Sequence, residues 1–109
     1  MDERRQLVRS LDKHVMGEGK PGGVGDMREI LDRNDGDVDK ALDDYASCAQ
    51  RFLCDAATSG TKEQRRDSGG ALVRVNTKTR ELGVLGDGGI VTYFKADNPE
   101  AEYLKELSK

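Results

Sequence analysis

The sequence predicts an α+β domain in which N-terminal helices pack on a small antiparallel β-sheet. Apolar residues recur every three or four positions up to about residue 55, the period of amphipathic helices, and every second position from residue 71, the period of strands. The 109 residues, 35% of them apolar, are enough for one domain of ordinary size. We therefore expect a single domain over 1–109, with a helical half at 1–55, a polar loop at 56–70, and a β-meander and tail at 71–109.

The helical half divides into three predicted helices. The first spans 2–16 and places Leu7, Leu11 and Val15 on one face, and the glycines of residues 17–25 end it in a flexible loop. The second spans 26–33 with Asp26 as its N-cap. The third spans 38–53, and its acidic first turn suits the helix dipole. Their inward residues are expected to be Met27, Ile30, Leu31, Leu42, Tyr45, Ala46, Ala49, Phe52 and Leu53.

The second half begins with a polar stretch, 55–70, that has no period and predicts a long connection. Three short strands are predicted at 71–75, 80–85 and 90–94, joined by turn-forming sequences at 76–79 and 86–89. A last short helix is expected at 99–107 with Ala101, Leu104 and Leu107 facing inward.

Alternation along the strands sorts their side chains into two faces. The face that helices are expected to cover carries Val73, Val75, Leu82, Val84, Val91 and Tyr93. The other face is a candidate site wall and carries Leu72, Arg74, Glu81, Gly83, Leu85, Ile90, Thr92 and Phe94.

Composition excludes several classes of protein. Charged residues make up 36% of the chain, the mean hydropathy is −0.76, and no apolar run approaches the ~20 residues of a membrane-spanning helix. The first residues lack the apolar stretch of a secretory signal, so we expect no export signal in the chain itself. Two cysteines are too few for a disulfide scaffold or a zinc site.

Charge is unevenly distributed along the chain. The net charge of −3 does not by itself indicate a nucleic-acid-binding protein. Residues 1–55 hold nine basic and thirteen acidic side chains, whereas residues 56–95 hold seven basic and four acidic ones. This positive middle is compatible with phosphate binding, and its cations are Lys62, Arg65, Arg66, Arg74, Lys78, Arg80 and Lys95, which Lys13 and Lys20 could join.

Two stretches suggest a calcium-binding or a phosphate-binding loop, but their residues do not match those motifs. An EF-hand loop with Gly36 at its sixth position would put Leu31, Arg33 and Leu42 at ligand positions, so a calcium-binding module is disfavoured. The glycines of 17–25 follow a helix rather than a strand and lack the Lys-Ser/Thr ending of a phosphate loop.

His14, the single histidine, is the candidate acid–base group. It ends the first predicted helix beside Lys13, and Glu18 lies four residues on, where it could orient the imidazole. Because His14 lies outside the apolar stripe of that helix, we expect it to contribute little to stability.

Three stretches resemble a known family. They are Lys13-His14-x-x-x-x-Gly19, the pattern Tyr45-x-x-x-Ala49-x-x-Phe52-Leu53, and the strand–turn–strand–turn–strand of residues 70–95 that ends Thr92-Tyr93-Phe94-Lys95. Over about residues 10–98 the chain resembles colicin D-type ribonucleases and the C-terminal toxin domains of contact-dependent inhibition. These domains have the barnase–EndoU–colicin–RelE-like nuclease fold.

The resemblance implies a metal-independent endoribonuclease, without cofactors, that cuts tRNA at or near the anticodon loop to give a 2′,3′-cyclic phosphate and a 5′-hydroxyl. It places the catalytic roles on His14, Lys13, Thr92, Lys95 and Glu18, the last matching an acidic position present in only part of the family. Phe94 would stack an unpaired base. From their charge, Arg74, Lys20, Arg65 and Arg66 are candidate substrate-binding residues.

The resemblance also implies a biological setting. The domain would be secreted or delivered from a cell surface within a larger toxin, act in the cytoplasm of a target bacterium, and meet a cognate, acidic immunity protein that covers the active site. No DNA substrate is expected. The alternative from a different class is a non-enzymatic interaction or adaptor domain in which His14 is incidental and the acidic helices form the working surface.

Overall fold

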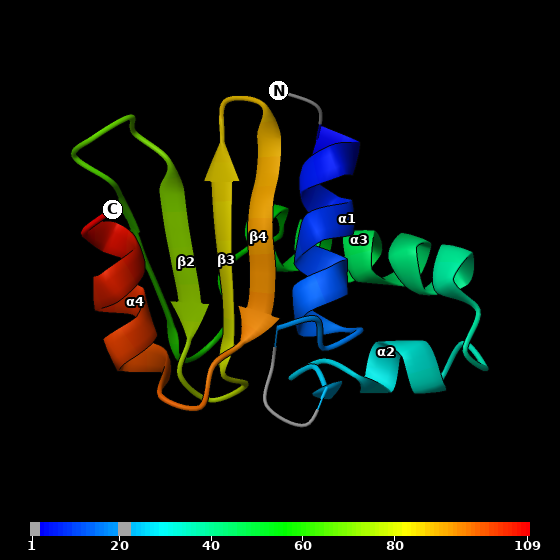
Figure 1. The fold of residues 1–109 in the computed structure, drawn as a ribbon. Helices are drawn as coiled ribbons and strands as arrows, with labels where there is room; N and C mark the ends of the chain where they lie inside the picture. The colour runs from blue at the N-terminus through cyan, green and yellow to red at the C-terminus, as the bar shows by residue number, and fades with distance from the viewer. Residues whose placement is uncertain (1–2, 20–22) are drawn as a thin grey trace.

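The computed structural model describes residues 3–19 and 23–109, and these form an α+β fold, as predicted (Figure 1). In chain order the elements are α1 (Glu3–His14), α2 (Glu29–Asp32), α3 (Val38–Cys54), β1 (Thr61–Arg65), β2 (Leu72–Asn76), β3 (Glu81–Gly86), β4 (Gly89–Lys95) and α4 (Pro99–Leu107). The strands form one antiparallel sheet in the order β1-β2-β3-β4. None of the helices in the described ranges is long and apolar enough to span a membrane.

Strand β1 lies inside the stretch predicted to be a polar loop, so that prediction is wrong for residues 61–65. β1 is an edge strand whose side chains are largely exposed, and its backbone pairs with β2, Lys62 opposite Val75 and Gln64 opposite Val73. An exposed edge strand needs no apolar period, because charged side chains suit an edge that must not pair with other chains. Its sequence therefore carries no signal that alternation could detect.

The predicted grouping of side chains is correct on β2 and β3. The prediction of an open site wall on the other face is wrong, however, because α3 packs on it through Leu53 against Gly83. Val73 lies opposite Val84, and Val75 lies opposite Leu82. These four valine and leucine side chains are fully buried and define what we call the front face of the sheet.

A β-bulge changes the faces on β4. Leu85 lies opposite Ile90, but the preceding Val84 lies opposite Thr92, so Val91 is an extra residue on β4. An extra residue reverses the face of every residue that follows it. As a result Thr92 and Phe94 share the front face, whereas Tyr93 lies on the back face with Arg74 and Gly83, the opposite of what alternation predicted.

Helices cover both faces of the sheet. Figure 1 shows α3 behind the sheet, with α4 and α1 at its two sides. The back cluster joins α1, α2 and α3 to the sheet and contains the predicted inward residues Leu7, Leu11, Val15, Met27, Ile30, Leu31, Leu42, Tyr45, Ala49 and Leu53. The predicted apolar stripes of these helices are therefore confirmed.

Helix α4 spans the predicted residues but turns a different side inward. Asn98 caps it by accepting a hydrogen bond from the Ala101 backbone N–H, and Pro99 occupies its first turn. Tyr103 and Leu107 pack on the front cluster of the sheet, whereas Leu104 is 65% exposed and Ala101 is exposed. The expectation that Ala101 and Leu104 face inward is wrong.

Asp26 is not the N-cap of the second helix. α2 begins at Glu29, and its N-cap position is Arg28, which makes no side-chain capping bond. The carboxylate of Asp26 is instead used in a long-range contact with the end of α1.

Candidate active site

A cleft of about 710 Å³ opens on the front face between α1 and α4. Val91, Thr92 and Phe94 of β4 contribute to its floor, with Ser10 and His14 on the α1 side. Six Lys or Arg and four Asp or Glu residues line it, an excess of two positive charges in a chain whose net charge is −3. The cations are Arg9, Lys13, Arg66, Lys95, Lys105 and Lys109. A local positive region of this kind can attract a polyanion to an acidic protein.

One side of α1 supplies the first wall of the cleft. Gln6, Ser10 and His14 are spaced by four residues and so lie on one helix face, with Arg9 and Lys13 beside them. The apolar stripe of the same helix faces the back cluster. α1 therefore packs along β4 with an apolar side in the core and a polar side in the cleft.

His14 is held on two sides. Its ring stacks on Phe94, with centroids 4.6 Å apart and planes 12° from parallel. Its Nδ1 lies 2.9 Å from Oδ1 of Asp26. The residue is only 5% exposed, so His14 is buried even though it lies outside the apolar stripe of α1.

The loop before α2 brings Asp26 to His14. A Cβ at Gly25 would lie 2.3 Å from the carbonyl oxygen of His14, so only glycine fits there, and the backbone N–H of Met27 donates to that same carbonyl at 2.7 Å. The second carboxylate oxygen of Asp26 accepts the backbone N–H of Lys95 at 2.8 Å. Asp26 thus joins the end of α1 to the end of β4.

Asp26 takes the place predicted for Glu18. The exposed Glu18 lies beside Arg9, Asp12, Lys13 and Gly19, outside the cleft. Its predicted role in orienting the imidazole is therefore wrong, because α1 ends at His14 and the chain turns away at Gly17 rather than continuing for another helical turn.

The environment fixes which nitrogen of His14 can exchange a proton. Burial alone would raise the pKa of Asp26, but the hydrogen bond and the charge of His14, together with the backbone N–H of Lys95, hold that pKa below its ordinary value. An ionised carboxylate only accepts hydrogen bonds, so Nδ1 of His14 is the donor. Nε2 is then the nitrogen that can gain or lose a proton.

A chain of hydroxyl groups lies beneath Thr92. Its Oγ1 is 3.0 Å from Oγ of Ser10, which is 2.5 Å from the hydroxyl of Tyr45, and Tyr45 donates to the backbone carbonyl of Tyr93. Burial raises the pKa of Tyr45 above its ordinary value, so this hydroxyl keeps its proton. The chain fixes the position of Thr92 in the cleft floor.

The structure brings five of the predicted site residues to the cleft beside His14: Lys13, Thr92, Phe94, Lys95 and Arg66. Lys95 also pairs with Glu29 at 2.9 Å. Phe94 is 9% exposed and has one ring face against His14, so it supports the imidazole rather than offering a platform for a base. Its predicted stacking role is therefore corrected.

Two other predicted substrate-binding residues lie elsewhere. Arg74 is on the back face, where its guanidinium donates to the carbonyls of Phe52 and Asp55 and pairs with Glu63 at 2.6 Å. Arg65 does not line the cleft, and its side chain donates to the carbonyl of Gly70. Lys20 lies outside the described residues.

Sequence reasoning missed Ser10, Asp26, Arg9, Lys105 and Tyr45. The spacing of Ser10 and His14 on one helix face was a usable signal, since residues four apart are neighbours on a helix. No signal in the sequence identified Asp26, because its contact with His14 depends on how the glycine loop folds back onto α1.

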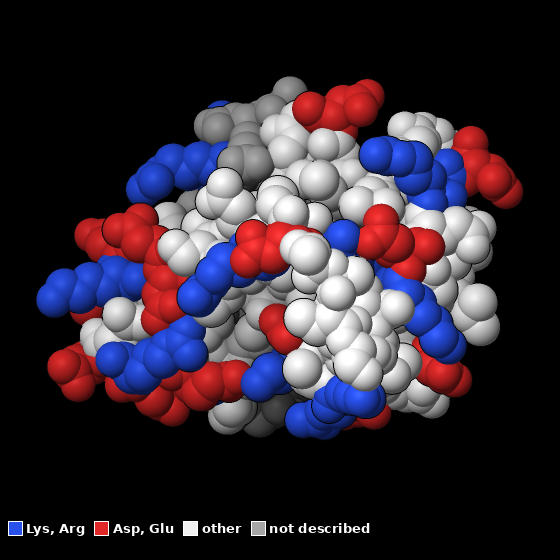
Figure 2. Space-filling view, turned by 180° about the vertical axis from the view of Figure 1, so that it is seen from behind, with Lys and Arg blue, Asp and Glu red and all other residues white. Residues whose placement is uncertain are grey.

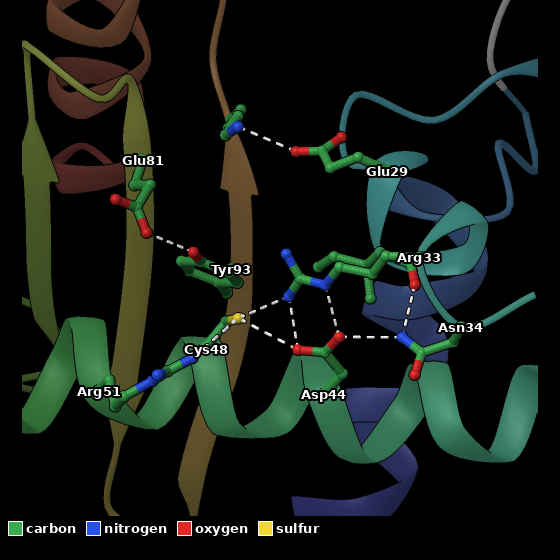
Figure 3. A network of polar contacts seen from close by, with 10 residues as sticks. Glu29, Arg33, Asn34, Asp44, Cys48, Arg51, Glu81 and Tyr93 are labelled. Carbon is green, nitrogen blue, oxygen red and sulfur yellow. Dashed lines mark hydrogen bonds and ion pairs between the residues drawn. The ribbon is translucent and has the colours of Figure 1, made fainter.

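A second polar cluster occupies the back of the molecule and is shown in Figure 3. Arg33 of the loop after α2 pairs with Asp44 of α3 through two nitrogens, and this pairing holds the pKa of Asp44 at about 2. Cys48, a free thiol, contacts Arg33, Asp44 and Arg51 at 3.3–3.6 Å. Figure 2 shows acidic and basic side chains side by side over this face. The Arg33–Asp44 ion pair of this cluster fastens the end of α2 to α3.

Among the residues that the structure describes, no three His, Cys, Asp or Glu side chains are grouped to hold a metal ion. Comparison with models of protein families, with curated proteins and with solved structures finds no match to the chain. Any function must therefore follow from the cleft geometry and from the motifs in the sequence.

Proposed function

We propose that the protein is a metal-independent endoribonuclease that cleaves tRNA, with a fold of the barnase–EndoU–colicin–RelE-like class. The observation that carries this proposal is a buried histidine, His14, oriented by the carboxylate of Asp26 at the floor of a cleft with excess positive charge. A carboxylate-oriented imidazole is suited to acid–base chemistry near neutral pH, and the cations suit a phosphodiester substrate.

The reaction needs only groups that the cleft contains. The ribose 2′-oxygen attacks the adjacent phosphorus, the bond from phosphorus to the 5′-oxygen breaks, and the products are a 2′,3′-cyclic phosphate and a free 5′-hydroxyl. Nε2 of His14 performs one of the two proton transfers, taking the 2′-hydroxyl proton or protonating the leaving 5′-oxygen, and solvent water exchanges the other proton. Lys13 stabilises negative charge on the non-bridging oxygens. The protons of Tyr45 and Ser10 are used along the hydroxyl chain, so the Thr92 proton points to Ser10 in the free protein, and Thr92 donates to a non-bridging oxygen by turning this proton from Ser10 to the substrate.

The biological role follows from the family resemblance. The domain would act as a toxin in competition between bacteria, carried into the target cytoplasm within a larger protein. A cognate immunity protein with an acidic surface would bind over His14 and the cations of the cleft and exclude the substrate.

Cleavage of total tRNA in EDTA tests the proposal. The wild-type protein is expected to give discrete fragments with cyclic-phosphate ends, and His14→Ala is expected to lower the rate by roughly 10²–10⁴-fold. Because His14 is buried, a fold control is needed: Leu31→Ala removes a buried side chain of α2 that does not line the cleft and should keep its cleavage activity when folded.

Added imidazole gives a sharper readout. It should restore part of the cleavage by His14→Ala, because free imidazole can exchange the missing proton but cannot repair a folding defect. Intact tRNA with folded wild-type protein would contradict the nuclease and favour the interaction domain.

A further inference from the structure

The second wall of the cleft, formed by α4 and Arg66, contains charged residues to which the proposed mechanism assigns no role. The resemblance to toxin nucleases ends near residue 98, whereas Lys105, Glu106 and Lys109 of the C-terminal segment line the same cleft as His14. The α4 part of the wall is thus a feature of this chain that the family motifs do not describe.

Arg66 is the most firmly held cation of this wall. Its Nε donates to the backbone carbonyl of Glu106 at 2.7 Å, and its Nη2 pairs with the Glu106 carboxylate at 2.9 Å. Glu106 is 6% exposed, and its other carboxylate oxygen pairs with Lys109 at 2.9 Å. Two cations therefore neutralise this buried carboxylate, and the guanidinium plane is fixed on one side.

The remaining nitrogen of Arg66, Nη1, has no hydrogen-bond partner within the described ranges 3–19 and 23–109. A guanidinium that is held by two of its nitrogens and has the third free is pre-organised for a phosphate oxygen, since little side-chain entropy remains to be lost.

Lys105 is a second cation that lines the same cleft as Arg66. It is exposed, lines the cleft, and makes no side-chain hydrogen bond or ion pair with the described residues. On the opposite wall, Arg9 and Lys13 of α1 are likewise exposed and unpaired with the described residues. Cations that are not engaged by carboxylates thus lie on both sides of the floor that holds His14.

We propose that Arg66 and Lys105 form a phosphate subsite for the RNA nucleotide next to the cleaved bond, so that the RNA strand crosses the cleft from α1 to α4. The subsite binds a backbone phosphodiester and selects no base, because contacts to phosphate carry no sequence information. This inference rests on the proposed ribonuclease function. The subsite predicts that substrates with a phosphate next to the cleaved bond are cleaved faster than those without one.

Substrate length tests the subsite. Once the cleaved bond in tRNA has been mapped, kcat/KM is measured on the dinucleotide that contains only that phosphate and on a pentanucleotide centred on it. Lys105→Glu is expected to lower kcat/KM roughly tenfold on the pentanucleotide, to have a much smaller effect on the dinucleotide, and to reduce the salt slope of pentanucleotide binding by about one.

The matched control is Lys40→Glu, the same charge change at an exposed lysine of α3 far from the cleft lining. It accounts for the change in net charge and should leave the ratio of the two kcat/KM values unaltered.

Two further variants test the chemistry of the subsite. Lys105→Arg should retain most of the preference for the pentanucleotide over the dinucleotide. The paired variant Arg66→Gln with Glu106→Gln removes the guanidinium while leaving two amides that can bond to each other, and should lower the same ratio.

The outcomes separate the two proposals. If the wild-type protein cleaves neither substrate nor tRNA, the ribonuclease function fails and the subsite with it. If the wild-type protein cleaves both but Lys105→Glu and the Arg66/Glu106 variant behave like Lys40→Glu, the function stands and the subsite is wrong. Equal losses on both substrates would also overturn the subsite, since the residues would then act at the cleaved phosphate.

Discussion

The front cleft and the polar cluster of Arg33, Asp44, Cys48 and Arg51 on the back of the molecule hold similar residue types but arrange them differently. On the back, Arg33 and Asp44 satisfy each other through two hydrogen bonds at a partly exposed site. In the cleft, a buried histidine is held by one carboxylate, and Arg9, Lys13 and Lys105 stand unpaired with any described residue. Paired charges fasten one helix to another, whereas the unpaired cations around the buried imidazole contact no described carboxylate and are free to bind the proposed substrate. Residue type alone does not distinguish the two.

Exchanging one carboxylate in each region should separate their roles. Asp26→Asn is expected to lower RNA cleavage roughly 10- to 100-fold, because an amide no longer stabilises the imidazolium and can favour the wrong ring tautomer. Asp44→Asn, the matched change on the back, should leave cleavage within about twofold. The measurement is kcat/KM on one tRNA, with circular dichroism to verify folding. Equal losses of kcat/KM in the two variants would show that the two regions do not differ in function.

The hydroxyl chain under the cleft should be a larger source of stability than the surface ion pair behind it. Tyr45→Phe removes the buried hydroxyl that donates to the backbone carbonyl of Tyr93 and bonds to Ser10, so the free energy of unfolding in urea should fall by about 1–3 kcal/mol. Tyr103→Phe is the control, since the Tyr103 hydroxyl makes no hydrogen bond to the described residues, and it should change stability by less than about 0.5 kcal/mol. Similar losses would mean that the hydroxyl chain contributes nothing specific.

The smallest expected effect concerns how the stability supplied by the Arg33–Asp44 ion pair on the back of the molecule depends on pH. Arg33 lowers the pKa of Asp44 to about 2, below the ordinary carboxyl value near 4. The ion pair therefore contributes its full stability above about pH 4 and loses it as the pH falls towards 2. Asp44→Asn should flatten the fall in unfolding free energy over this interval by a fraction of a kcal/mol, as for an exposed pair. An unchanged slope would show that Asp44 is not linked to folding.

Much of the fold was predictable because most elements bury one side of a local period. The stripe of Leu7, Leu11 and Val15 marks α1, and the alternation of Val73 and Val75 marks β2. β1 was missed because its exposed side chains have no pattern to detect. The inward side of α4 was mispredicted because a nine-residue helix has few apolar positions, and the tertiary contact selected Tyr103 and Leu107.

The candidate site was predictable only in part. Lys13, His14, Thr92 and Lys95 meet at one cleft, as the motifs suggested. Thr92 reached that cleft, however, because the extra residue Val91 turned the end of β4 over, and strict alternation would have placed it on the side of Arg74.

By itself, then, the sequence determined the α+β class, most of the helix and strand positions, and the choice of His14 as the candidate acid–base group, since each depends on local spacing or on a unique residue. Only the tertiary structure decided that Asp26 rather than Glu18 holds His14, and that α4 and Arg66 form the second wall of the cleft. The physical reason is that these contacts join residues far apart in the sequence. Contacts between residues such as His14 and Asp26, or Arg66 and Glu106, form when loops close and strands take their register, and neither process leaves a periodic trace in the chain.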